Sequence, residues 1–145
     1  QALGAMDASK ELRQLFDSEK SLENRKSILQ ALGVAGDTRS LVGIAASNEP
    51  EDIRIEAIEA LGIADDDDSG ENLVRIYQAA SSPKIREAAL QGMLISDDSD
   101  SMLKLYKQAS SKEEKQALLR MLTLTGSDAT LDLIEAELDK AGKQP

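Results

Sequence analysis

The chain has 145 residues, of which 41% are hydrophobic and 30% are charged, so it is too apolar for a disordered segment and too polar for a membrane span. Lysine and arginine total 17 against 27 aspartates and glutamates, and the net charge of −10 opposes contact with a nucleic-acid backbone. Histidine and cysteine are absent, which removes the commonest catalytic bases, metal ligands and thiol nucleophiles. These counts favour a helical, non-catalytic protein with no cofactor, no nucleic-acid partner and no direct insertion into a membrane.

A short apolar segment recurs along the whole chain. QALGAMD opens the sequence, QALGVAGD begins at Gln30 and EALGIADD begins at Glu59, with looser copies at Gln91 and Arg120. The longest step between copies coincides with an acidic insertion, Asp65–Gly70. Such a period predicts an array of helical repeats. One apolar anchor residue per copy, at spacings of 29, 29, 32 and 29 residues, marks the repeat: Leu3, Leu32, Leu61, Met93 and Leu122.

Each repeat is expected to contain two short helices, because apolar residues recur at helical spacing both before and between the anchors. First helices are predicted over residues 9–17, 38–47, 70–80, 99–109 and 128–141. Second helices are predicted over 21–33, 50–63, 83–95 and 112–124, and residues 1–5 are expected to be the tail of another. Polar side chains that can cap the first helices stand before or at their starts: Ser9, Asp37, Ser69, Asp98 and Ser127 or Asp128.

Proline and glycine mark the predicted boundaries of the second helices. Pro50 and Pro83 suit the first helical position, where a missing N–H costs nothing. Gly33 and Gly62 follow the anchor leucines and are expected to end their helices. All aromatic residues occupy one position of the first helix, which we expect to lie in the core between repeats rather than to form a ligand platform: Phe16, Tyr77 and Tyr106.

The segment from Arg54 to Asp65, RIEAIEALGIAD, resembles a HEAT repeat of the short bacterial class, and the similarity covers essentially the whole chain. The resemblance implies an all-α fold: a right-handed α-solenoid of stacked antiparallel helix pairs, with about four to five repeats and the second helices along the concave face. Residues 1–145 would form a single HEAT-like repeat domain, and a fragment of a longer array is expected because the repeats are cut at both ends. The segment Leu105–Leu122 is similar to arrays in secreted or envelope bacterial proteins, which favours an extracytoplasmic location over a cytoplasmic one.

A basic residue lies seven positions before each later anchor, at Arg25, Arg54, Arg86 and Lys115. Such a column could bind an anion or tie neighbouring repeats together. The HEAT resemblance implies the second role, a structural ladder in which each base pairs with an aspartate of an inter-repeat loop. The expected partners are Asp37, Asp65 or Asp66, Asp97 or Asp98, and Asp128.

The acidic loop Asp65–Asp68, followed by Ser69 and Gly70, is similar to the first half of a calcium-binding EF-hand loop. Its twelfth position would be Ile76, where that loop requires a bidentate glutamate. We therefore expect a solvated turn, and no metal ligand is assigned. A weak cation-responsive module at this loop stays open as an alternative function.

The outward stripe of the second helices is the candidate site for a partner. Polar side chains recur there at nine, six and two positions before each anchor, and Ile55 is an apolar exception. We predict a monomeric, non-enzymatic scaffold or adaptor that binds another protein or peptide segment through this stripe, with a structural spacer between flanking domains as the alternative. The predicted contacts are Lys26, Gln30, Asp52, Ile55, Glu59, Glu87, Gln91, Gln116 and Arg120.

Overall fold

The computed structural model describes residues 2–143, and in that range the chain consists of helices joined by short turns, without a β-strand. The all-α prediction is therefore confirmed. In chain order the helices are α1 (Ala2–Ser18), α2 (Leu22–Val34), α3 (Thr38–Ala45), α4 (Glu51–Ala64), α5 (Ser69–Ala79), α6 (Pro83–Ile95), α7 (Ser99–Gln108), α8 (Lys112–Thr123) and α9 (Asp128–Lys143).

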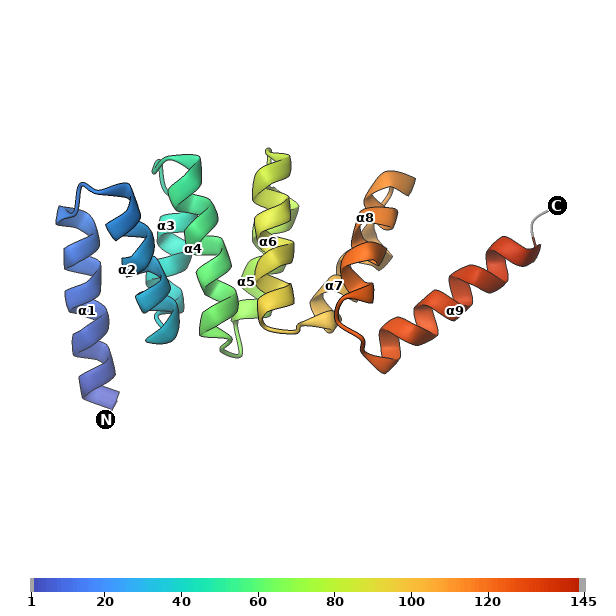
Figure 1. The fold of residues 1–145 in the computed structure, drawn as a ribbon, viewed down its shortest axis with the longest axis horizontal. Coiled ribbons are helices and arrows are strands. Elements are labelled where there is room, and N and C mark those ends of the chain that lie inside the picture. The colour runs from blue at the N-terminus through green and yellow to red at the C-terminus, as the bar shows by residue number, and fades with distance from the viewer. Residues whose placement is uncertain (1, 144–145) are drawn as a thin grey trace. The chain divides into compact units, whose positions relative to one another are not determined.

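The helices fall into two compact units, Gln1–Ser96 and Asp97–Pro145, called unit 1 and unit 2 here. Unit 1 stacks three helix pairs, α1/α2, α3/α4 and α5/α6, and its second helices lie side by side with α3 and α5 behind them (Figure 1). Helix α4 packs directly on both α2 and α6, whereas within the described residues α1, α3 and α5 make no comparable contacts with one another. Unit 1 therefore curves toward its second helices. In unit 2, α7 and α8 form a pair that α9 contacts. The single repeat domain inferred from the sequence stays a prediction.

The repeat anchors form the centre of the core. Leu32, Leu61, Met93 and Leu122 are all fully buried, and the side chain of Leu3 lies outside the described residues. The aromatic column is also buried, with 1% of Phe16 and 7% of both Tyr77 and Tyr106 exposed, which confirms its predicted place in the core. Burying one leucine of this kind contributes about 2 kcal/mol to folding.

The second helices end at a left-handed residue, four positions after each anchor. The φ angles are +76° at Gly36, +43° at Asp65, +56° at Asp97 and +64° at Gly126. Glycine adopts this conformation without strain, and aspartate tolerates it better than most residues, so the helix can stop sharply there. The prediction that Gly33 and Gly62 end their helices was wrong, because both lie inside helices and are buried.

These two glycines instead allow neighbouring helices to approach closely. A Cβ atom on Gly33 would lie 2.8 Å from the carbonyl oxygen of Ala60, and one on Gly62 would lie 2.2 Å from that of Gly92. Real Cβ atoms are not found this close to backbone oxygens. The Leu32-Gly33 and Leu61-Gly62 pairs therefore each combine a buried anchor with a contact between helix backbones.

Helix α1 differs from the other copies because it runs without a break from Ala2 to Ser18. The sequence predicts a tail over residues 1–5 and a new helix capped by Ser9, and that prediction was wrong. Asp7, which stands four positions after the anchor Leu3, remains helical. A tail of a few residues cannot support a helix of its own, and extending one helix is easier than nucleating a second.

Most of the predicted helix starts are confirmed. Side-chain oxygens of Asp37, Asp98 and Ser127 accept the backbone N–H groups of Ser40, Ser101 and Thr130. Pro83 is the first residue of α6, as expected. Pro50 instead precedes α4 as its cap residue, and Ser69 is the first residue of α5.

Candidate functional site

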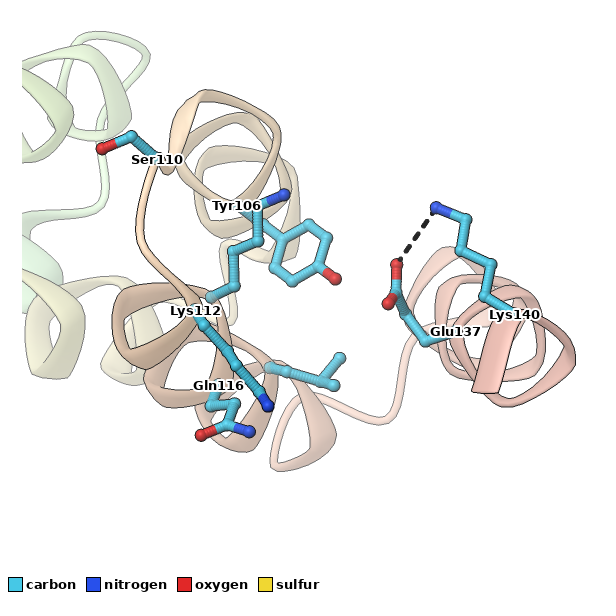
Figure 2. Close-up of a pocket in the computed structure, with 8 residues that line it drawn as sticks. Tyr106, Ser110, Lys112, Gln116, Glu137 and Lys140 are labelled. Carbon is cyan, nitrogen blue, oxygen red and sulfur yellow. Dashed lines mark ion pairs between the residues drawn. The ribbon is translucent and has the colours of Figure 1, made fainter. Parts of the chain in front are cut away.

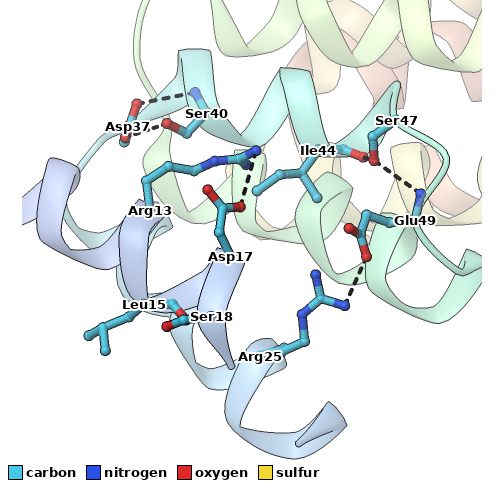
Figure 3. Close-up of polar contacts among 10 residues, drawn as sticks. All are labelled: Arg13, Leu15, Asp17, Ser18, Arg25, Asp37, Ser40, Ile44, Ser47 and Glu49. Carbon is cyan, nitrogen blue, oxygen red and sulfur yellow. Dashed lines mark hydrogen bonds and ion pairs between the residues drawn. The ribbon is translucent and has the colours of Figure 1, made fainter. Parts of the chain in front are cut away.

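Arg25 on α2 makes the best-defined contacts of the basic column (Figure 3). Its Nη1 atom lies 2.8 Å from Glu49 Oε2 at the turn between α3 and α4, and its guanidinium carbon lies 4.1 Å from the centre of the Phe16 ring. Only 18% of the Arg25 side chain is exposed, so water screens these interactions less than at an open surface. Arg25 thereby links α1 and α2 to the following repeat.

The aspartates expected to pair with this column have other partners. Asp37 caps α3, and Asp66 accepts a hydrogen bond from Thr38 Oγ1 in the preceding repeat. Arg54 Nε donates to the carbonyl of Ala45 at 2.9 Å. The predicted Arg–Asp pairing was therefore wrong for these residues, because short acidic side chains beside a helix start find amide and hydroxyl donors nearby.

The remaining bases of the column, Arg86 on α6 and Lys115 on α8, have exposed side chains. The expected partner of Arg86 was Asp97 or Asp98, and Asp98 instead caps α7 through Ser101. The link between repeats in the acidic loop is instead the neutral hydroxyl of Thr38, whose side chain is buried and bonds to Asp66 at 2.5 Å. Among the described residues of unit 1, the contacts between repeats include the Arg25–Glu49 ion pair, the Thr38–Asp66 and Gln30–Glu56 hydrogen bonds and the glycine approaches, rather than a uniform ladder of Arg–Asp pairs.

The Asp65–Asp68 loop is organised around a carboxylate that is already bonded. Asp66 accepts hydrogen bonds from Thr38, from the Ser69 hydroxyl and from the backbone of Asp68, and these bonds lower its pKa. Within the described part of the chain, no group of three or more acidic, histidine or cysteine side chains is arranged to hold a metal ion. The loop thus closes α4, starts α5 and joins two repeats.

The predicted partner stripe lies on the accessible side of the second helices in unit 1. Gln30, Asp52 and Glu87 are exposed, and the others are half-buried: Lys26, Ile55, Glu59 and Gln91. These residues lie on helices that pack against one another, because α4 contacts both α2 and α6. Ile55 is therefore less open to solvent than its place in the sequence pattern suggests.

Glu59 is the electrostatic centre of this surface. Gln30 Nε2 donates to Glu56 Oε1 at 2.8 Å, which fixes a second carboxylate near it. Burial raises the pKa of Glu59, the negative charges of Glu56 and Glu87 raise it further, and Lys26 opposes the effect. The surface thus holds an excess of negative charge that would be relieved by a cation from outside.

Two substitutions test the local electrostatics with opposite signs. Glu49→Gln should lower the melting temperature near neutral pH, because Arg25 lowers the pKa of Glu49 and the resulting stabilisation is fully present above the unfolded value of 4.5. Glu59→Gln should raise the melting temperature near neutral pH, because a raised pKa means that ionisation destabilises the folded state.

Circular dichroism melts at about pH 7 and about pH 3 check both substitutions. The difference in melting temperature between Glu49→Gln and the native chain should shrink as the pH falls through the lowered pKa of Glu49. The difference between Glu59→Gln and the native chain should disappear below the unfolded pKa of Glu59. If both substitutions change the melting temperature in the same direction at neutral pH, the opposite roles assigned to Glu49 and Glu59 would be contradicted.

An apolar row continues the stripe at the last turn of the second helices. Val34, Ile63 and Ile95 are 80%, 40% and 50% exposed, and each lies two residues after an anchor. They follow Gln30, Glu59 and Gln91 by four residues, one helical turn, so they stand on the same face. The sequence interpretation missed this row, although its repeat register and four-residue spacing were visible.

Unit 2 carries the remaining stripe positions on α8, where Gln116 and Arg120 are both exposed. Gln116 and Lys115 line a cleft of about 570 Å³ together with Tyr106 from α7 and Glu137 from α9 (Figure 2). Glu137 pairs with Lys140 at 3.6 Å. Burial, and then the nearby Glu137 carboxylate, raises the pKa of Tyr106, so this phenol stays protonated in the cleft at neutral pH.

A family model for HEAT repeats matches residues 9–93, more than half of the chain. The chain belongs to the HEAT repeat family. The match covers α2 to α5 in full and most of α6, and it agrees with the stacked helix pairs of unit 1. The α-solenoid of HEAT-like repeats predicted from the sequence is thus confirmed. No curated protein matches the chain significantly, and neither does any solved structure.

HEAT repeats commonly serve as scaffolds for protein interactions, and the family is generally non-catalytic. In the part of the chain that the structure describes, no helix is both long and apolar enough to cross a membrane.

Proposed function

We propose that this HEAT repeat protein is a non-catalytic scaffold that binds a segment of another protein across α2, α4 and α6. The site comprises the predicted stripe of unit 1, together with the apolar row that the structure adds to it. Gln116 and Arg120 occupy the same repeat positions in unit 2 and stay predicted contacts. No catalytic group and no cofactor takes part in this function.

The observation that carries the proposal is the apolar row itself. Single exposed apolar residues are ordinary on protein surfaces, but here the same position of three successive repeats exposes Val34, Ile63 and Ile95. Folding does not require apolar side chains at these positions, because each anchor two residues earlier is already buried. A polar band beside an apolar row on rigid helices is the arrangement that a protein interface needs.

The alternative, a spacer that only sets the distance between flanking domains, receives less support. A spacer requires buried contacts between repeats and a soluble surface, and the anchors and glycines supply those contacts. Neither the apolar row nor the half-buried Glu59 would serve such a role. Both features are explained by a partner that covers the row and supplies positive charge to the acidic middle.

Affinity capture from an extract of the source organism tests the proposal with three baits. The native chain is compared with Glu59→Lys/Glu87→Lys and with a control of equal charge change, Glu11→Lys/Glu71→Lys, on α1 and α5. We expect one protein to be retained by the native and control baits and reduced at least about tenfold on the stripe variant. Equal retention on all three baits would contradict the proposed site.

A further inference from the structure

The apolar row has a regular pitch, because it follows three helices packed side by side. Val34, Ile63 and Ile95 stand at the same position of α2, α4 and α6, and α4 packs on both neighbours. Packed helices have axes about 8–10 Å apart, and the close approach of Gly62 to Gly92 excludes a wider separation of α4 and α6. The row therefore repeats about every 9 Å.

Only some backbone conformations place successive side chains at this pitch on one face. A β-strand returns to the same face every second residue, about 6.6 Å along the chain, and an α-helix advances about 5.4 Å per turn. A polyproline II segment returns to the same face every third residue, after about 9.3 Å. An extended segment with a three-residue period therefore stays in step with the row over all three helices.

The charge around the row indicates which residues a bound segment would carry between its apolar side chains. Helix α4 carries the acids Glu51, Asp52, Glu56 and Glu59 against one base, Arg54. Glu59 lies one turn before Ile63, and Asp65 and Asp67 follow directly after the helix. An anionic border on both sides of an apolar residue favours a segment with basic side chains next to its apolar ones.

We infer that the row of Val34, Ile63 and Ile95 docks an extended, cationic segment of a partner protein that carries an apolar side chain at every third residue. The inference rests on the proposed function and names the chemistry of the partner. Each apolar side chain of the segment would contact one repeat, and its lysines or arginines would lie over Glu59 and the Asp65–Asp67 turn. A polyproline II segment is preformed in solution, so it loses little conformational entropy on binding.

A fluorescence anisotropy titration with a labelled peptide of about twelve residues that repeats leucine-proline-lysine tests the inference. A second peptide has the same composition but places its leucines at alternate positions. We expect the re-spaced peptide to bind at least about tenfold more weakly than the regular one. On the protein side, Val34→Ser/Ile95→Ser should weaken binding of the regular peptide at least about tenfold.

Leu15→Ser is the matched control, since Leu15 on α1 is 53% exposed but lies outside the row. If both peptides bind the native chain equally and the Val34→Ser/Ile95→Ser chain loses this binding, the three-residue period of the bound segment is overturned. The same result would still support the proposed function. Equal binding to the native chain and that variant, or no saturable binding of either peptide, would overturn the inference. The affinity capture with the Glu59→Lys/Glu87→Lys bait tests the proposed function independently of the peptide titration.

Discussion

Gly62→Ala is expected to destabilise unit 1 by about 3 kcal/mol, although the same change inside a helix normally stabilises a protein. The added Cβ would lie 2.2 Å from the carbonyl oxygen of Gly92 and 2.9 Å from its Cα atom. These are backbone atoms, which cannot rotate away as a side chain can. Helices α4 and α6 would have to separate, and the buried contacts of Ile58 and Met93 would loosen with them.

Gly43→Ala is the control for this prediction. Gly43 lies inside α3, and a Cβ added there would meet no atom within 4 Å. Alanine should therefore stabilise the chain by about 0.5–1 kcal/mol through its higher helix propensity. Urea unfolding followed by circular dichroism measures both changes. A Gly62→Ala chain as stable as the Gly43→Ala chain would contradict the close contact between α4 and α6.

Leu122→Ala is expected to cost about 3 kcal/mol of folding free energy in unit 2. Leu122 is the last anchor and is completely buried near the end of α8, so truncation leaves a cavity that the surrounding helices cannot fill. Leu124, two residues later, is 65% exposed, and the same substitution there should change stability by less than about 0.5 kcal/mol.

Both variants replace a leucine by alanine, and the two positions are only two residues apart. The difference between their unfolding free energies therefore measures the effect of burial. Urea titrations of both variants and of the native chain, followed by circular dichroism, supply the free energies. Similar costs for Leu122→Ala and Leu124→Ala would mean that the repeat register is displaced in this part of the chain. The anchor assignment in unit 2 would then have to be abandoned.

The core could be predicted because the sequence presents each repeat position several times. The anchors Leu32, Leu61, Met93 and Leu122 and the aromatic column recur at fixed spacing, and an apolar residue kept in register is expected to be buried. Caps at Asp37 and Asp98 were also visible, since a capping side chain acts within its own turn.

The role of the Leu-Gly pair could not be read from one repeat. A glycine near the end of a helix fits both a left-handed cap and a close helix contact, and only the backbone of the neighbouring repeat decides between them. The cap lies three residues later, where aspartate replaces glycine at Asp65 and Asp97. The partners of Arg25 and Arg54 were missed for the same reason, because Glu49 and the Ala45 carbonyl are brought near only by packing.

Much of the candidate site followed from helical periodicity, which placed Gln30, Glu59 and Glu87 on the accessible face. The apolar row was missed because apolar residues near a helix end are usually assigned to the core. Val34 and Ile95 depart from that rule because the anchor of the same turn already fills the core position. The four-residue step from the stripe to the row was the available signal.

Site-specific cross-linking tests the central claim most directly, namely that a partner protein covers the second-helix face of unit 1. The chain has no cysteine, so single cysteines at Gln30 and Gln91 on that face, or at Arg39 and Glu71 on the first helices, can each carry one photo-cross-linker. We expect the captured partner to cross-link from Gln30→Cys and Gln91→Cys and not from Arg39→Cys or Glu71→Cys. Cross-linking from the first-helix positions alone, or equally from all four, would contradict the account.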